Sequence, residues 1–380
     1  MTTIDRVERI PLFHELEEPF ANGQGFVKSR EYLLVRVIAS DGAVGYGECI
    51  GPVAGNDQII DRLLGPALVG TDAAEGPATL TRIGDDLRRR FKSYVPYGAV
   101  GGVEIALWDL RGKLLGRSVG DLLGGRHHER VPAYVTGHYF RGGLGLDDQV
   151  GRIEDEARGH VARGFRRVKL KLGLHGVGYG RDADARLMER LRLALTDDVA
   201  LMADANCAYD LMQARRVGRC AQELGYEWFE EPLPATDLVG YAALARELDI
   251  PVSAGESWGD PAVFGAALRE RAVDLIQPDM VAAGGIEAVR RVLALAEAHG
   301  VAAQPHVWGT AVVMAAALQV LTARATSPLF EFDASPNPVR DGLLGGQLPL
   351  GDDGTVDVPS GPGLGIEIPA EALERFRDRR

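Results

Sequence analysis

Two lysines stand two positions apart in an otherwise apolar stretch, VKLKLG, at residues 168–173. Side chains alternate between the two faces of a strand, so Lys169 and Lys171 point to the same face. Only five of the 42 basic residues are lysines. Arginine keeps its proton in proteins, whereas lysine can be tuned into a base. The pair predicts either a solvated edge strand or a base with a cationic neighbour.

Further ionisable residues follow short apolar segments such as VALMA, YEWF and IPVSAG in the same way. The residues are Lys171, Asp204, Glu230, Glu256, Asp279, His306 and Glu331. Their successive spacings are 33, 26, 26, 23, 27 and 25 residues. This rhythm is typical of parallel βα units, whose strand C-terminal ends share one rim of a barrel. We therefore expect these side chains to meet at that rim.

The elements that would position them fall into two regions. From Val131 onward, short apolar runs alternate with longer amphipathic ones, which predicts a TIM-type (β/α) barrel over 128–344. Before it, residues 31–39, the turn at Asp41 and Gly42, and a second short run predict a β-hairpin, and 56–124 predicts helices. We expect an α+β capping domain over 1–127, completed by a C-terminal segment at about 345–380.

Composition excludes several classes of function. The chain has 380 residues, 46% of them hydrophobic, and a net charge of −12, whereas nucleic-acid binders show a basic face. Its three cysteines lack a C-x-x-C spacing, which favours a reducing compartment. The N-terminus has no apolar core of a signal peptide, and no run of 18 apolar residues occurs. These features predict a cytoplasmic protein without nucleic-acid or membrane partners.

Three carboxylates, Asp204, Glu230 and Glu256, would converge from adjacent strands. They would repel one another without a cation, and all-oxygen ligation selects Mg²⁺ before Mn²⁺. The alternative is the pair of carboxylic acids of a glycosidase. Glu231 points to the opposite side from Glu230, so only one of them can face the others. The sequence favours one Mg²⁺ per subunit, with Mn²⁺ as a substitute.

His306 also follows a predicted strand, and Asp279, which ends the preceding strand, is placed to orient its ring. Lys171 and His306 would then lie on opposite sides of the acids. Two such groups can remove a proton from carbon on one face and deliver one from the other. The metal and Lys169 would stabilise the enolised carboxylate and lower the pKa of Lys171 toward neutrality.

Other residues near the rim carry weaker signals. Asn206 could support the metal or a substrate oxygen, or close a turn. Trp258 and His138, with the adjacent Tyr139, could line the pocket or pack at the rim. The glycine-rich segment 175–181 lacks a nucleotide-binding spacing and is assigned no cofactor.

The motifs VKLKLG, ADAN, FEEP, AGES, QPD and QPHVWGT, in this order, resemble those of the mandelate racemase and muconate lactonizing enzyme group of the enolase superfamily. GYGEC, ALWDLRGKLLG and SGPGLGIEI are similar to its capping segments. The resemblance implies a modified (β/α)7β barrel with a capping domain. It also implies site roles: Mg²⁺ on the three acids, Lys171 as base beside Lys169, the His306–Asp279 dyad as opposite acid or base, and Glu331, or Asp333 in its place, on the substrate carboxylate.

The resemblance further implies that loops 21–30, which includes Lys28, and 49–56 close over the substrate. PHVWGTAV and EFDASPNPVRDGLL look most like the galactarolactone cycloisomerases and related acid-sugar dehydratases. The implied reaction removes a proton α to a carboxylate and expels a β oxygen from an acid sugar or its lactone. Alternatives are a racemase, epimerase or dehydratase for another carboxylate such as a hydroxyproline, and a non-catalytic binding barrel. The family implies a homo-oligomer, a dimer or an octamer.

Overall fold

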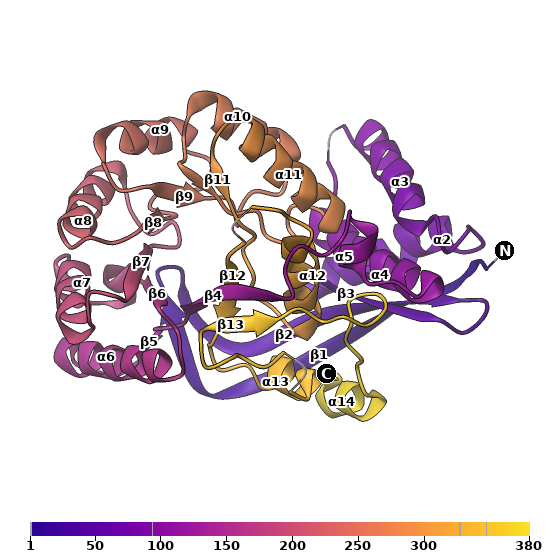
Figure 1. Cartoon of the computed structure of the whole chain (residues 1–380), viewed down its shortest axis with the longest axis horizontal. Helices are drawn as coiled ribbons and strands as arrows, with labels where there is room; N and C mark the ends of the chain where they lie inside the picture. The colour runs from indigo at the N-terminus through magenta and orange to yellow at the C-terminus, as the bar shows by residue number, and fades with distance from the viewer. Residues whose placement is uncertain (1, 93, 327, 347) are drawn as a thin grey trace.

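The computed structural model describes residues 2–92, 94–326, 328–346 and 348–380, in which two sheets lie side by side (Figure 1). The first is antiparallel, with the order β3-β2-β1-β5. Its strands are β1 (Ile4–Asn22), β2 (Gly25–Ala39), β3 (Val44–Cys49) and β5 (Phe140–Arg141). The predicted hairpin is the β2–β3 pair. Strand β1 was not expected from the sequence.

The helices of the first region follow β3 along the chain, and several of them contact this sheet. They are α1 (Val53–Ile59), the π-helix η1 (Ile60–Leu64), α2 (Gly65–Leu68), α3 (Gly76–Arg90), α4 (Tyr97–Leu115) and α5 (Val119–Leu122). Helix α4 lies directly on β3, where two glycines permit the contact. A Cβ at Gly45 would stand 2.1 Å from the Ala106 oxygen, and one at Gly47 1.9 Å from the Gly102 oxygen.

The second sheet is a curled parallel sheet with the order β11-β10-β9-β8-β7-β6-β4-β12 (Figure 1). Its strands are β4 (Arg130–Thr136), β6 (Arg167–Lys171), β7 (Ala200–Asp204), β8 (Phe229–Glu230), β9 (Val252–Ala254), β10 (Leu275–Ile276), β11 (Ala302–Ala303) and β12 (Phe330–Asp333). A helix follows each strand before β12, which confirms the predicted (β/α)7β arrangement with a capping domain.

Seven helices surround the parallel strands. They are α6 (Leu146–Ala162), α7 (Ala183–Ala194), α8 (Leu211–Glu223), α9 (Leu238–Glu247), α10 (Pro261–Glu270), α11 (Ile286–Ala298) and α12 (Ala311–Thr322). A 3₁₀ turn, η2 (Leu174–Val177), follows β6. None of the helices in the described ranges combines the length and apolarity that a membrane span needs.

The C-terminal segment returns to both sheets. Strand β13 (Thr355–Asp357) pairs antiparallel with β4, after α13 (Pro338–Leu344). Helix α14 (Ala370–Phe376) contacts β1, and a bridge joins Leu12 to Arg377. The boundaries 1–127, 128–344 and 345–380 stay a prediction.

Two buried carboxylates of the first region hold the N-termini of two barrel helices. Glu104 on α4 accepts the N–H groups of Ile286 (2.7 Å) and Glu287 (3.0 Å) at the start of α11. Glu48 on β3 accepts the N–H of Thr310, 3.0 Å away, before α12. Burial raises the pKa of both carboxyls to about 7. Because α11 and α12 follow the segments with Asp279 and His306, these contacts tie the first region to the predicted dyad.

Candidate active site

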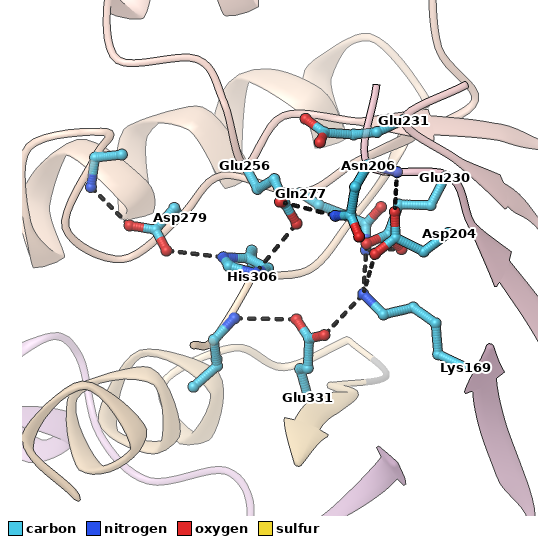
Figure 2. Close-up of polar contacts among 12 residues, drawn as sticks. Lys169, Asp204, Asn206, Glu230, Glu231, Glu256, Gln277, Asp279, His306 and Glu331 are labelled. Atoms are coloured by element: carbon cyan, nitrogen blue, oxygen red, sulfur yellow. Dashed lines mark hydrogen bonds and ion pairs between the residues drawn. The ribbon is translucent and has the colours of Figure 1, made fainter. Parts of the chain in front are cut away.

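The three predicted metal ligands meet at the C-terminal ends of adjacent strands. Asp204 ends β7, Glu230 ends β8, and Glu256 follows β9 by two residues. Each offers an oxygen, and the three oxygens lie within 4.8 Å of one another (Figure 2). The buried Oδ1 of Asn206, two residues past Asp204, has no hydrogen-bond partner. Converging carboxylates beside a spare amide oxygen fit a hard divalent cation.

Neighbouring donors fix the orientation of these carboxylates. The Asn206 N–H donates to Asp204 Oδ1 (2.9 Å), and Trp228 Nε1 and Gln277 Nε2 donate to Glu230 Oε2 at 2.9 and 3.0 Å. Glu231 points away from the group, as Figure 2 shows, and its backbone is left-handed with φ +39°. Burial, with Glu256 and Asp204 nearby, raises the pKa of Glu231 well above its ordinary value.

Both lysines of β6 form ion pairs inside the barrel. Lys169 is fully buried and contacts Glu230, and its Nζ lies 2.7 Å from Glu331 Oε1. Lys171 pairs with Asp204, and its Nζ stands 5.5 Å from the ring centroid of Tyr139. The interpretation of a solvated edge strand is therefore wrong, because β6 lies between β4 and β7.

Neighbouring side chains set the pKa of Lys171. Burial and Lys169 lower it, but the charge of Asp204 outweighs them and raises the pKa above its ordinary value. The lowering toward neutrality was predicted for Lys171 with a cation beside it, and it stays a prediction. Asp204 is the group that holds the proton on Lys171.

His306 and Asp279 form the predicted pair. His306 Nδ1 lies 2.8 Å from Asp279 Oδ2, while Asp279 Oδ1 accepts the N–H groups of Val281 and Ala282 at 2.8 and 2.7 Å (Figure 2). The other ring nitrogen of His306 stands 3.1 Å from Glu256 Oε2. Burial lowers the pKa of His306, but the surrounding carboxylates, Glu256 first, outweigh burial and raise it to about 10.

Glu331 is the second residue of β12 and forms an ion pair with Lys169. Its Oε2 also accepts the backbone N–H of Val307 at 3.0 Å. Burial raises its pKa, yet Lys169 and His306 more than compensate and lower it below the ordinary value. Asp333 is engaged elsewhere, with Arg340 Nη1 at 3.1 Å. In this arrangement Glu331 supports Lys169, and its contact with a substrate carboxylate stays a prediction.

A cavity of about 580 Å³ opens between the barrel rim and the first region. Lys171 and His306 both line it. The sheet order places β7, β8, β9 and β10 between β6, which ends at Lys171, and β11, which precedes His306. The tip of the β1–β2 hairpin and the segment after β3 close its outer side. The lining residues from these two segments are Phe20, Asn22, Gln24, Gly25, Phe26, Val27, Ile50 and Gly51. The predicted capping loops therefore reach the site.

The predicted substrate contacts divide between the cavity and other places. Asn206 lines the cavity. Trp258 instead packs on Phe264 and donates its indole N–H to the Ala235 oxygen at 2.9 Å. His138 is fully buried and bonds the Lys169 carbonyl. Lys28 lines a separate surface hollow beside Phe26, so these three lie outside the described lining of the catalytic cavity.

The sequence analysis did not identify two residues near the cavity, one aromatic and one cationic. Trp308, two residues after His306, is part of the lining. The buried Arg30 of β2 stacks on it, with its guanidinium carbon 4.8 Å from the Trp308 ring centroid, and donates to the Pro336 oxygen at 3.0 Å. The position of this tryptophan in the motif QPHVWGT could have indicated that it lies near the site. Arg30 carried no such signal, since 36 other arginines accompany it.

Comparison with known proteins identifies the family of the chain. Residues 7–124 match the family described as the mandelate racemase / muconate lactonizing enzyme N-terminal domain, and 152–372 match the enolase C-terminal domain-like family. The chain is 37% identical over 377 residues to a D-galactarolactone cycloisomerase of Agrobacterium fabrum, covering 96% of both chains.

Solved structures give the same result. The 3,6-anhydro-D-galactonate cycloisomerase of Zobellia galactanivorans matches with a TM-score of 0.87 and 30% identity, over 99% of this chain and all of the other. An L-talarate dehydratase from Polaromonas sp. JS666, complexed with Mg and L-glucarate, matches with a TM-score of 0.81 and 26% identity, over 100% of this chain and 98% of that one. The chain belongs to the mandelate racemase and muconate lactonizing enzyme group of the enolase superfamily, and it is an enzyme of that group.

Proposed function

We propose that the protein is a Mg²⁺-dependent enzyme that removes the proton α to the carboxylate of an acid sugar, or of its lactone, and eliminates an oxygen from the β carbon. The observation that carries the proposal is the placement of Lys171 and His306 in one cavity, on either side of the three carboxylates. The names of the relatives, which include sugar-acid cycloisomerases and dehydratases, support the substrate class.

Asp204, Glu230 and Glu256 would hold the cation. A cation held there would offset the negative charge of the substrate carboxylate and of Asp204, the group that raises the pKa of Lys171. Lys171 is the base that takes the α-proton, and the buried Lys169 adds positive charge beside it. Fixed charges placed where charge develops in the transition state are the largest single contribution to the rate acceleration of many enzymes.

His306 is the acid that protonates the departing oxygen. Asp279 holds Nδ1, so Nε2 faces Glu256 and the cavity. The departing group is water in an open-chain acid and the ring oxygen in a lactone. Asn22, Gln24, Asn206 and Ser257 give the cavity wall uncharged polar groups suited to sugar hydroxyls.

Turnover of a panel of aldonic acids, aldaric acids and their lactones, with Mg²⁺ in deuterated buffer, tests the proposal. The expected product is a 2-keto-3-deoxy acid. Deuterium incorporation with inversion alone would make the enzyme an epimerase or racemase instead, since two opposed groups also serve that reaction. Binding without any exchange, unaffected by a chelator, would indicate a binding protein. A homo-oligomeric state stays a prediction.

A further inference from the structure

A second cluster of potential ligands lies outside the catalytic cavity, between the curled sheet and α6. It contains His138, two residues past β4, and Glu156 and His160 on α6. Residues four apart share a helix face, so the α6 pair points toward His138 together. One ligand atom from each residue lies within 4.8 Å of the other two. The catalytic mechanism uses none of these side chains.

The two histidine rings are buried and incompletely bonded. His138 has no exposed surface, and His160 is 7% exposed. His138 Nε2 and both ring nitrogens of His160 lack hydrogen-bond partners, although buried polar atoms nearly always have one. The rings meet edge to face with centroids 5.2 Å apart. Unpaired nitrogens from two elements thus face a shared space.

Neighbouring groups hold the side chains of the cluster by hydrogen bonds, as hydrogen bonds commonly orient the ligands of a metal ion. His138 Nδ1 lies 2.9 Å from the Lys169 carbonyl oxygen, which can only accept, so Nδ1 carries the proton and Nε2 keeps its lone pair. Glu156 Oε1 accepts the backbone N–H of His138 at 2.9 Å, and Oε2 accepts an N–H of Arg152 Nη1 at 2.8 Å. Glu156 Oε1 is also 3.8 Å from His160 Nε2.

A glycine keeps the space beside these atoms open. A Cβ at Gly137 would stand 3.1 Å from Glu156 Oε1 and 4.0 Å from His160 Nε2. Any larger residue at 137 would occupy the volume that the two ligand atoms border. Gly137 therefore contributes to the cluster by lacking a side chain.

We propose that His138, Glu156 and His160 form a second divalent-metal site, selective for Zn²⁺ and similar transition metals over Mg²⁺. Imidazole nitrogens suit Zn²⁺, whereas Mg²⁺ prefers oxygen. Zinc bonds of about 2.0 to 2.1 Å require ligand atoms roughly 3.4 Å apart, so the side chains close around the ion slightly. Water or another small donor completes the tetrahedron.

The position of the site indicates a structural role. The ion would join the segment after β4 to α6 and, through His138, to the backbone of Lys169. The next residue, Tyr139, lines the catalytic cavity beside Lys171. The following residues, Phe140 and Arg141, pair with β1. The site would thus fix a segment that connects the antiparallel sheet of β3, β2, β1 and β5, called the capping sheet, with the rim of the catalytic cavity.

Zinc titration of the full-length protein in a large excess of Mg²⁺ tests the proposal, with bound metal measured after desalting. The wild type should retain one equivalent of Zn²⁺. An Asp204→Asn/Glu230→Gln variant, which lacks the first carboxylate centre, should retain it as well. His160→Gln should weaken Zn²⁺ binding at least about tenfold, while the exposed control His299→Gln should not.

Cobalt provides an independent readout. Co²⁺ in the carboxylate variant should show the intense visible bands of a four-coordinate nitrogen-containing site, and His138→Gln should abolish them. Zn²⁺ should also raise the melting temperature of the wild type, which keeps the proposal testable if a histidine variant does not fold. Equal Zn²⁺ retention by His160→Gln and wild type, or no retention and no thermal shift in the wild type, would overturn the proposal.

Discussion

Glu48 and Thr310 join the capping sheet to the barrel through a buried carboxylate. Glu48 Oε2 accepts the threonine hydroxyl at 2.5 Å and the backbone N–H at 3.0 Å. Thr310 caps α12 by accepting the Val312 N–H, and it lies four residues after His306. The contact therefore links β3 to the segment that follows a proposed catalytic residue.

This contact predicts a specific pH dependence of stability. Burial raises the pKa of Glu48 from 4.5 to about 7, so the folded state binds the proton more tightly than the unfolded state. The tighter proton binding adds about 3 kcal/mol to the free energy of unfolding. This contribution is fully present below pH 4.5 and is lost as the pH rises through about 7. Glu48→Gln removes this loss and keeps an acceptor for Thr310.

Urea denaturation of Glu48→Gln and wild type at several pH values measures the difference. The stability of the variant relative to wild type should increase between pH 4.5 and 7 and then level off. The exposed Glu371→Gln serves as the control. A difference between Glu48→Gln and wild type that is constant across this range would show that the carboxyl of Glu48 does not titrate there.

Lys169→Met should destabilise the protein strongly. The ammonium group contacts Glu230 and lies 2.7 Å from Glu331, with no exposure to solvent. Removing it leaves buried carboxylates unpaired, which costs about 3 to 5 kcal/mol. The double variant Lys169→Met/Glu331→Gln should recover part of this loss. A loss in Lys169→Met below about 1 kcal/mol in urea denaturation would contradict the arrangement.

The β1–β2 hairpin tip depends on a close backbone contact at Gly23. A Cβ there would stand 2.7 Å from the Ala205 oxygen, and one at Gly173 would stand 2.7 Å from the Gly23 Cα. Gly23→Val should therefore lift the tip from the rim and raise KM at least about tenfold. Gly180→Ala, which meets open space, is the matched control. Unchanged kinetics in Gly23→Val would show that the tip does not close the site.

Removal of divalent cations should abolish turnover. Asp204, Glu230 and Glu256 then have no cation to offset their charge, and the substrate carboxylate loses its counter-ion. The expected loss is at least about a thousandfold. Mg²⁺ should restore the rate fully, and Mn²⁺ at least partly. Turnover that persists after chelation, checked by metal analysis of the same sample, would exclude the proposed role of the carboxylates.

Much of this site could be predicted from the sequence because a parallel barrel repeats its rim once per βα unit. Asp204, Glu230 and His306 were found from that spacing alone. The direction of a side chain that lies beyond the end of a strand does not follow from this spacing. His138 turns through a left-handed backbone with φ +62°, and its ring ends between the sheet and α6. Trp258 likewise turns into the packing around Phe264.

Contacts between the two regions could not be predicted in the same way. Glu48 in GYGEC and Glu104 in VEIALW are single carboxylates in apolar stretches, and only the fold shows that each meets a helix N-terminus. Strand β1 was missed because charged residues interrupt its second half, LEEP, where the register with β2 also shifts. These contacts and this strand depend on residues that are distant in the sequence.

The central claim is that Lys171 takes the α-proton and His306 protonates the departing oxygen. The most direct test follows α-deuterium exchange and product formation together, in Lys171→Ala and His306→Asn, on a substrate identified with the wild type. Each variant should lose elimination by about a hundred- to ten-thousandfold. His306→Asn should still exchange the α-proton, whereas Lys171→Ala should not. Exchange that survives in Lys171→Ala and is lost in His306→Asn would contradict the assignment and reverse the two roles.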